Sequence, residues 1–441
     1  MTDWAAVRSE FPALEPRDGV GPPAYLDSAC MSLVPRAVLA AMEEYYREYP
    51  GCAGRSLHRF AEEVGHRYES ARETFARFLG AADPAGIVFL RNATEAINLV
   101  GQGIGWNRGD RVVITDQEHN SNLVLWQRLA RERGIVVEIL DLPDGGGFDR
   151  PALERVLARP VRLVSLFQTS NLDGRSLPIR EIAEAAHAAG GELLVDGCQA
   201  APHERVDLGR LGADYYALSL HKMLGPSGTG LLASTPEVLA RLRPLIVGGE
   251  TVEWTTLTDH ALRPPPHRFE AGLQNYAGVL GATAGVEMLE RVGRDAVRSH
   301  DADLNARATS GLAGEPRIRI LGPASPADRP SILAFSIDGI DPHDAALFLD
   351  TGHRVLVRSG RHCVHSWYDR RGLVGNVRAS FYLYNTNDDV DALVEGVREL
   401  IARLPETAAR RVPGTRSTGT SASKRQAAAP RGPSRRRGAG S

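Results

Sequence analysis

The chain of 441 residues is 43% hydrophobic and 24% charged, and its net charge is −2. This composition is typical of a globular protein, and no apolar run reaches the roughly 18 residues that a membrane helix needs, so we expect no membrane contact. No basic segment followed by an apolar stretch is visible at the N-terminus, which predicts no secretory signal and a cytoplasmic location. The four cysteines (Cys30, Cys52, Cys198 and Cys363) show no metal-ligand spacing, so we expect no metal site.

The length favours two folded units, and the composition of the C-terminal residues indicates a separate tail. We expect an N-terminal segment over residues 1–24, a large domain over 25–290, a smaller C-terminal domain over 291–405 and a basic tail over 406–441. Nine basic residues and no acidic ones follow Glu406, so the chain up to that point carries a net charge of −11. The tail is rich in Ser, Gly, Pro and Ala, which predicts disorder. Such a tail is either a solvated appendage or a contact for nucleic acid or an acidic partner.

Between residues 86 and 235, apolar strand patterns alternate with amphipathic helical stretches. The expected strands cover residues 86–91, 111–115, 136–140, 162–167, 192–196 and 230–234. Near-continuous apolar strands separated by helices predict an α/β fold with a large, mostly parallel sheet that is covered on both faces. Ligands of such sheets bind beyond the carboxyl ends of the strands.

A helical stretch near residues 275–312 leads into a second pattern. The expected strands there cover residues 332–337, 354–360 and 376–384, and helices lie around 342–350 and 388–404. This pattern predicts a smaller α+β domain packed on the first.

The expected strand 86–91 is followed by the sequence RNATEAINLV, which opens a helix. Thr94 and the free amide groups around Ala93 and Glu95 can bind a phosphate group at this helix N-terminus. A plain helix cap is the alternative interpretation.

Two further strands of the large domain are followed by polar residues at the same sheet edge. His119, in QEHNSN, can stack on a cofactor ring or move protons, although a histidine after a strand can also be structural. Asn171, in QTSNLDGRSLP, can hydrogen-bond a ring oxygen or a substrate, although loop asparagines commonly make turns.

Lysine is almost absent from this chain. Only two of its 52 basic residues are lysines, and Lys424 lies in the tail, so Lys222 is the one lysine of the expected folded body. Chance retention is one explanation. A job that arginine cannot do is the other, because a lysine amine can lose its proton and form a Schiff base with an aldehyde.

The residues around Lys222 suit a pyridine aldehyde cofactor. Asp196 ends the expected strand 192–196, where a carboxylate can keep a pyridine nitrogen protonated, and Gln199 follows it. Ser219 and His221 precede Lys222 in SLHKMLGPSGTG and can add phosphate donors.

Two candidate site residues come from the C-terminal domain. Arg378 lies in an expected strand, where its planar guanidinium can bind an amino acid carboxylate. Cys363 lies in the loop RSGRHCVHSWYD, and its basic neighbours should favour the thiolate, although a cysteine can also be a small buried hydrophobe. These neighbours are Arg358, Arg361, His362 and His365.

With these motifs, the chain resembles the fold-type I, class V aminotransferase-like enzymes that use pyridoxal 5′-phosphate. Within them it is most similar to the cysteine desulfurases and selenocysteine lyases. The likeness runs from YLDSA (25–29) to about residue 400. It rests on the blocks RNATEAIN, EHNSN, DGCQAAPH, SLHKMLGPSGTG, RFEAGLQN, VRSGRHC and VRASFYLYNT.

The resemblance implies a role for each candidate residue. Lys222 would bind the cofactor, and Cys363 would be the nucleophile that accepts sulfur. Arg378 would hold the substrate carboxylate, with Asn171 beside it. The remaining cofactor contacts would be His119 on the ring face, Asp196 at the ring nitrogen, Gln199 at the ring hydroxyl, and Ala93, Thr94, Ser219 and His221 at the phosphate.

The resemblance further implies a homodimeric cysteine desulfurase that converts L-cysteine to L-alanine. Sulfur would pass to Cys363 as a persulfide and then to an acceptor protein or a thiol. Leu273 stands where the family usually has a phosphate-binding threonine, and Cys30 where it has a small residue. The alternatives are a C–S lyase, a selenocysteine lyase, an epimerase, an aminotransferase, or a binding protein without turnover.

Overall fold

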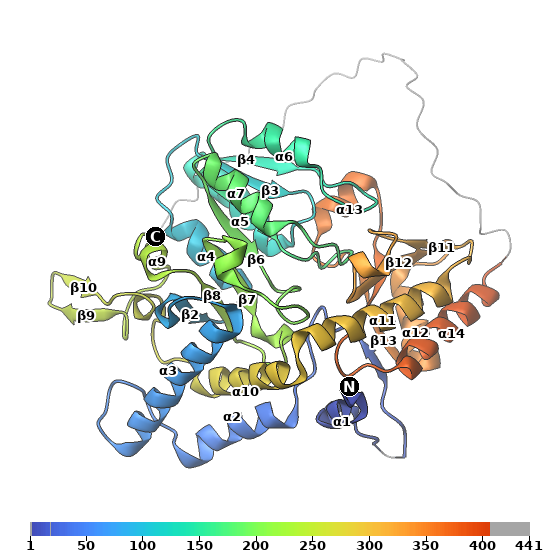
Figure 1. Cartoon of the computed structure of the whole chain (residues 1–441), viewed down its shortest axis with the longest axis horizontal. Coiled ribbons are helices and arrows are strands. Elements are labelled where there is room, and N and C mark those ends of the chain that lie inside the picture. The colour runs from blue at the N-terminus through green and yellow to red at the C-terminus, as the bar shows by residue number, and fades with distance from the viewer. Residues whose placement is uncertain (1, 18, 406–441) are drawn as a thin grey trace, which may run out of the picture.

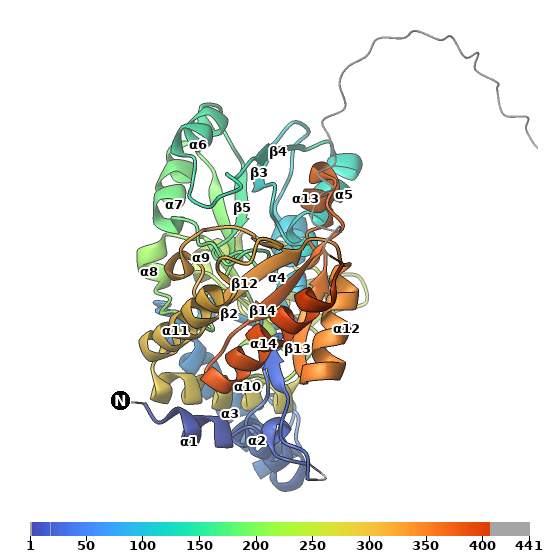
Figure 2. The same cartoon turned by 90° about the vertical axis from the view of Figure 1, so that its right-hand side faces the viewer.

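The computed structural model describes residues 2–17 and 19–405, so the expected tail lies outside the described residues. Two α/β units pack side by side (Figure 1), and the sheet and helices of the smaller unit face the viewer in Figure 2. In the described part of the chain, no helix is long and apolar enough to cross a membrane.

The larger unit is built on a sheet in which seven strands are described, in the order β2-β8-β7-β6-β5-β3-β4. Neighbouring strands are parallel from β7 to β4, whereas β8 is antiparallel to both β7 and β2. The strands are β2 (Ile87–Leu90), β3 (Arg111–Thr115), β4 (Val136–Leu140), β5 (Leu163–Phe167), β6 (Glu192–Asp196), β7 (Tyr215–Ser219) and β8 (Gly230–Ala233).

Both faces of this sheet are buried, which explains the near-continuous apolar strands. Val112 and Ile114 of β3 point into one core, whereas Val113 between them points into the other. The helices that contribute to the first core are α4 (Ala93–Gly103), α5 (Val124–Arg133) and α9 (Pro236–Ala240). The second core is covered by α2 (Arg36–Glu48), α3 (Arg59–Leu79), α6 (Arg150–Leu157), α7 (Ile179–Ala188) and α10 (Tyr276–Val292).

The smaller unit has a sheet in which five strands are described, in the order β1-β13-β14-β12-β11. They are β1 (Ala24–Leu26), β11 (Ile318–Ile320), β12 (Ile332–Ile337), β13 (Val355–Gly360) and β14 (Asn376–Ser380). Its core includes residues of α11 (Arg294–Leu312), α12 (Pro342–His353) and α14 (Asn387–Arg403). Because β1 pairs with β13 in parallel, the N-terminal part of the chain contributes a strand to the C-terminal sheet.

The remaining elements are short. They are α1 (Trp4–Ser9), α8 (Leu208–Leu211), α13 (His365–Arg371) and the antiparallel hairpin of β9 (Val252–Thr255) and β10 (His260–Leu262), which projects from the large unit in Figure 1.

Three local expectations differ from the structure. The helical stretch near 275–312 is two helices, because Gly293 between them has a φ of 86°. The strand expected to reach residue 384 ends at Ser380, because the chain turns just beyond it: the Tyr382 amide donates to the Asn385 side-chain oxygen, and the Asn385 amide donates to the Tyr382 carbonyl. Strand β7 was not among the expected strands. The expected domain boundaries stay a prediction.

Candidate active site

A cavity of about 220 Å³ lies where the carboxyl edge of the large sheet meets β13 and β14. Every residue to which the sequence analysis gave a cofactor, substrate or nucleophile role lines it, although the residues come from both units: Ala93, Thr94, His119, Asn171, Asp196, Gln199, Ser219, His221, Lys222, Cys363 and Arg378. The tertiary structure therefore brings the whole candidate set together. The role of each residue stays a prediction. Arg361 and His365, expected as basic neighbours of Cys363, are not among the lining residues.

One end of the cavity is formed by the N-terminus of α4. The Asn92 side chain caps this helix by accepting from the Glu95 amide, and the Ala93 amide donates to the Ser219 hydroxyl at 2.9 Å. The hydroxyls of Thr94 and Ser121 lie 2.7 Å apart beside it. Helix-terminal amides and hydroxyls are the groups that bind phosphate in proteins, so this end of the cavity suits an anion.

Lys222 and Asp196 follow two adjacent parallel strands. Asp196 is the last residue of β6, and its Oδ1 accepts from the Cys198 amide at 3.0 Å. Lys222 ends a short 3-10 turn directly after β7. That turn is fixed because the Ser32 amide and hydroxyl both donate to the His221 carbonyl, at 2.9 and 3.0 Å. Strand pairing thus places an amine and a carboxylate at the same sheet edge.

Two histidines of the cavity are uncharged near neutral pH. Burial, reinforced by the charge of Lys222, lowers the pKa of His119 to about 4 and that of His221 to about 4. The Nδ1 atom of His119 accepts from the Ser121 amide at 3.1 Å, so its remaining proton is on Nε2. A neutral ring is free to stack on an aromatic cofactor.

Behind His119 lies a buried polar network that the sequence interpretation missed. Glu118 is 2% exposed and accepts from the Thr115 hydroxyl at 2.6 Å and from the Asn122 amide at 2.8 Å. Burial, with a contribution from the charge of Asp196, raises the pKa of Glu118 to about 8. Its position beside His119 in QEHNSN was the available signal. The network holds the turn that carries His119.

Cys363 lies in a strained turn before α13. His362 and Cys363 have φ values of 47° and 60°, and such conformations cost about 1–3 kcal/mol each in residues other than glycine. The Asn171 side-chain amide donates to the His362 carbonyl at 2.7 Å, and the Asn120 backbone amide donates to the Cys363 carbonyl at 2.7 Å. The large unit therefore holds two consecutive carbonyl groups of this turn.

The charge around Cys363 is smaller than the sequence suggested. His362 is 5% exposed, and burial and the neighbouring Arg378 lower its pKa to about 3, so the expectation that it adds positive charge is wrong. Its Nε2 contacts the side-chain oxygen Oδ1 of Asn376, which also accepts from the Tyr368 hydroxyl at 2.9 Å. His362 is thus a buried anchor of the turn.

Arg378 lies on β14 and is only 3% exposed. Its Nη1 donates to the Asn171 carbonyl at 2.7 Å, and its Nη2 donates to Asp27 at 3.3 Å. In the described part of the chain its Nε has no hydrogen-bond partner. Burial raises the pKa of Asp27 although Arg378 and Arg358 act against this shift. A buried guanidinium with spare donors can receive a carboxylate.

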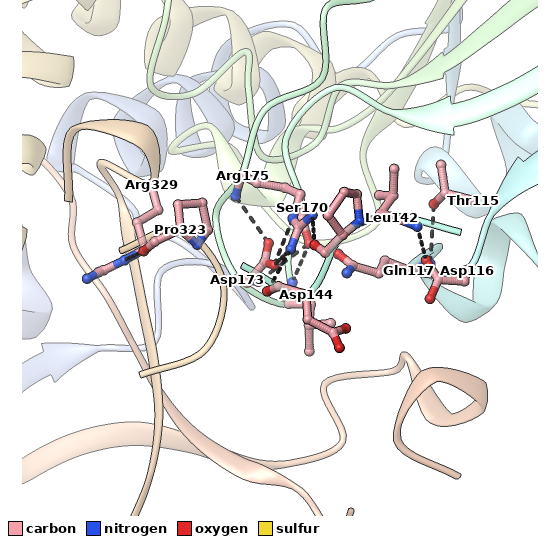
Figure 3. A network of polar contacts seen from close by, with 12 residues as sticks. Thr115, Asp116, Gln117, Leu142, Asp144, Ser170, Asp173, Arg175, Pro323 and Arg329 are labelled. Carbon is pink, nitrogen blue, oxygen red and sulfur yellow. Dashed lines mark hydrogen bonds and ion pairs between the residues drawn. The ribbon is translucent and has the colours of Figure 1, made fainter. Parts of the chain in front are cut away.

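The turn that presents Asn171 is braced by a buried ion pair. Figure 3 shows Arg175 and Asp173 next to Ser170. Nη2 of Arg175 lies 2.8 Å from Oδ2 of Asp173. The Ser170 amide donates to the Arg175 carbonyl at 2.8 Å, and Arg175 also donates to the Pro143 carbonyl at 2.6 Å. These contacts make the Asn171 turn a rigid part of the large unit.

Some residues of the cavity wall were not assigned a role from the sequence. They are Ala29, Cys30, Asn92, Ser121, Phe167, Thr169 and Cys198, whereas Arg358 and His362, which also line the cavity, were expected as basic neighbours of Cys363. Asn92, Ser121, Thr169 and Cys198 lie within two positions of a residue that was singled out, so the same motifs carried their signal. Cys30 is contacted by Arg358, with Nη1 3.3 Å from Sγ.

Comparison with known proteins identifies the family. The family model described as aminotransferase class-V matches residues 24–393. The chain belongs to the class-V aminotransferase family. This confirms the family resemblance and the expected α/β architecture of fold-type I.

Within the class-V family, the similar proteins are named cysteine desulfurases. A probable cysteine desulfurase of Halobacterium salinarum is 39% identical over 90% of this chain and 96% of its own length. The apo structure of a Thermococcus onnurineus cysteine desulfurase superposes with a TM-score of 0.87, at 35% identity over 92% of this chain and 99% of that one. The Escherichia coli cysteine desulfurase CsdA, in an S-sulfonic acid form, superposes with a TM-score of 0.84, at 34% identity over 92% of this chain and 100% of that one.

Proposed function

We propose that this protein is a pyridoxal phosphate-dependent cysteine desulfurase, which converts L-cysteine to L-alanine and transfers the sulfur to Cys363. The observation that carries the proposal is the cavity shared by Lys222, Asp196 and Cys363. An amine and a carboxylate suit an aldehyde cofactor, and a thiol in the same cavity can accept sulfur. The names of the similar proteins support the same activity.

The donor groups of the cavity fit pyridoxal phosphate. The α4 N-terminus with Thr94 and Ser219 suits the phosphate, and Asp196 suits the ring nitrogen. The loop before α4 packs closely on β8, since a Cβ on Gly230 would lie 2.4 Å from the Asn92 Cα. Bound pyridoxal phosphate would supply an electron-poor ring that accepts electron density from the amino acid.

The residues of the chain divide the remaining work. Lys222 would hold the aldehyde group of the cofactor, and its amine would move the proton of the substrate α-carbon. Asp196 would favour a positive charge at the ring nitrogen. The neutral His119 would cover the ring face, and Gln199 and Asn171 lie within the same cavity wall.

Arg378 and Cys363 act on the amino acid itself. Arg378 binds the substrate carboxylate through its guanidinium. The Cys363 thiolate attacks the substrate sulfur, so that an S–S bond forms while the C–S bond breaks. The electron pair of the C–S bond stays with the substrate β-carbon, which takes up a proton and becomes the methyl group of alanine. Cys363 is left as a persulfide, which an acceptor protein or a small thiol then discharges.

Two further features belong to this proposal. A homodimer is supported by exposed apolar side chains around the segment RFEAGLQN and the β9–β10 hairpin, among them Leu273, Ile246 and Trp254. A cytoplasmic location is supported by the cysteines, since all four lie in the described residues and all four are unpaired.

The test is product analysis with L-cysteine. The native enzyme should release alanine in equal amount to the sulfur transferred. Cys363→Ala should lose sulfur transfer while it still binds the cofactor, which its absorbance would show. Pyruvate instead of alanine would indicate a C–S lyase, and undiminished alanine formation by Cys363→Ala would overturn the assignment.

A further inference from the structure

The turn that carries Cys363 is not stable by its own conformation. Two consecutive non-glycine residues, His362 and Cys363, have positive φ values, which L-residues rarely adopt. Its internal support is one hydrogen bond, in which the Val364 amide donates to the Arg361 carbonyl at 2.8 Å. Such a conformation persists only where its surroundings hold it.

The large unit stabilises this turn through hydrogen bonds to two consecutive carbonyl groups, those of His362 and Cys363. The Asn120 amide that binds the Cys363 carbonyl belongs to the backbone and survives any substitution but proline. The Asn171 amide that binds the His362 carbonyl belongs to a side chain, so a point substitution can remove it. Asn171 itself is placed by the buried Asp173–Arg175 pair, whose side chains are 1% and 2% exposed.

Asn171 has a second contact in the same cavity. Its backbone carbonyl accepts from Nη1 of Arg378 at 2.7 Å, while its side-chain amide donates to the His362 carbonyl. One residue of the large unit therefore touches both the buried arginine of β14 and the turn of the thiol. These contacts join Asn171 to the smaller unit: Arg378 is 207 positions away in the sequence and His362 is 191 positions away.

We propose that Asn171 is a positioning residue for the nucleophile, which fixes the distance between the carboxylate-binding Arg378 and the sulfur-accepting Cys363. The proposal rests on the proposed function for the roles of these two residues. The Asn171 side chain both faces the substrate and, through its hydrogen bond to the His362 carbonyl, holds the turn that carries Cys363. One rigid turn of the large unit then fixes the positions of both the group that binds the substrate carboxylate and the thiol.

Removal of the amide should relax the turn without emptying the cavity. Asn171→Ala should lower kcat by about ten- to a hundredfold, because a nucleophile displaced by about 1 Å reacts that much more slowly. KM should change far less, because Arg378 remains. Asn171→Asp keeps nearly the same side-chain size but replaces the amide donor with a carboxylate oxygen, which the His362 carbonyl oxygen repels. It should therefore lower kcat at least as much.

A readout without turnover separates positioning from substrate contact. The full-length protein is treated with iodoacetamide, and peptide mass spectrometry follows the alkylation of Cys363, with Cys30 as an internal reference. Both Asn171 variants should change the Cys363 rate by about threefold or more, because the strained turn opens. Asn120→Ala is the matched control. It removes a side-chain contact with His365 but keeps the backbone bond to Cys363, so that rate should stay close to the native one.

Each result decides the proposal. Native-like alkylation in both Asn171 variants would overturn it, as would a rise in KM with unchanged kcat, which would make Asn171 a substrate contact alone. Folding is checked by the thermal unfolding midpoint of the same samples. If the native protein formed no alanine from cysteine, the proposed function would fail, whereas the alkylation rates would still report on the turn.

Discussion

The Arg371 guanidinium of α13 lies 3.2 Å from the Asp116 carboxylate at the end of β3, measured from Nη1 to Oδ2. The same side chain reaches Asp144 at 2.7 Å and lies over the Trp367 ring, 4.3 Å from its centroid. Asp116, labelled in Figure 3, is 3% exposed at its side chain and also accepts from the Leu142 amide. Arg371 therefore joins the helix that follows Cys363 to the large unit.

Arg371→Ala should destabilise the protein by about 1–3 kcal/mol, because it leaves the buried Asp116 carboxylate without its cation. Urea unfolding followed by circular dichroism measures the change. The neighbouring Arg370 pairs with Asp141 at the exposed surface, so Arg370→Ala is the control and should leave the unfolding midpoint unchanged. Equal effects of the two substitutions would contradict a role for burial.

Glu118 should make stability fall as the pH rises toward 8. Its pKa is raised to about 8 in the folded state from an ordinary value of 4.5, so the folded state binds an extra proton between these values. Its contribution is complete below pH 4.5 and is lost as the pH rises through 8. Within this window the unfolding free energy should fall by at most about 1.4 kcal/mol per pH unit.

Glu118→Gln, which is neutral at every pH, should remove this decline. Urea unfolding at several pH values between 6 and 8 compares the variant with the native protein, and the exposed Glu132 gives the control substitution Glu132→Gln. Parallel pH profiles for the native protein and Glu118→Gln would show that Glu118 is ionised in the folded state.

Arg378→Lys should raise the KM for L-cysteine by about ten- to a hundredfold, because a lysine keeps the charge but loses the planar pair of donors. Steady-state kinetics measures the change. Cysteamine lacks the carboxylate, so its weak binding to the native protein should be the same in the variant. An equal loss with cysteamine would place the effect in the fold, through the contact of Arg378 with Asn171.

Lys222 should be the attachment point of the cofactor. After borohydride reduction of the native protein, peptide mass spectrometry should find the pyridoxal group on the peptide that contains Lys222. Lys222→Ala should carry no such adduct and should form no alanine, whereas alkylation of Cys363 should continue. An adduct on another amine, or turnover by the variant, would exclude Lys222 from this role.

Much of the candidate site could be predicted because its residues follow strands. Asp196 and His119 stand at or just past the ends of expected strands, and parallel strands end at one sheet edge, so local sequence and elementary topology were enough. The helix-terminal position of Thr94 was visible for the same reason. The alternation of strand and helix patterns similarly predicted the large sheet. Lys222 was found instead by the scarcity of lysine, because strand β7 before it was not expected.

Other features had no local pattern to reveal them. Strand β1 pairs with β13 across more than 300 positions of sequence, and no periodicity in Ala24–Leu26 indicates its partner. From its residue type alone, His362 was expected to be charged. Its burial against Asn376 and the neighbouring charge of Arg378 lower its pKa, so it is neutral. The burial of a side chain depends on how the two units pack together, so it could not be inferred from the residues next to it in the sequence.

Residue types and their spacing were enough to indicate the chemistry available to this protein: one lysine in the folded body, a carboxylate at a strand end, an arginine in a second unit and a cysteine in a polar loop. The tertiary structure decided where that chemistry acts. Asn171 meets both Arg378 and the turn of Cys363 because the loop that follows β5 packs against β14 and against the turn before α13. Contacts of this kind depend on three-dimensional packing between distant segments, and that packing has no signature in residue type or spacing.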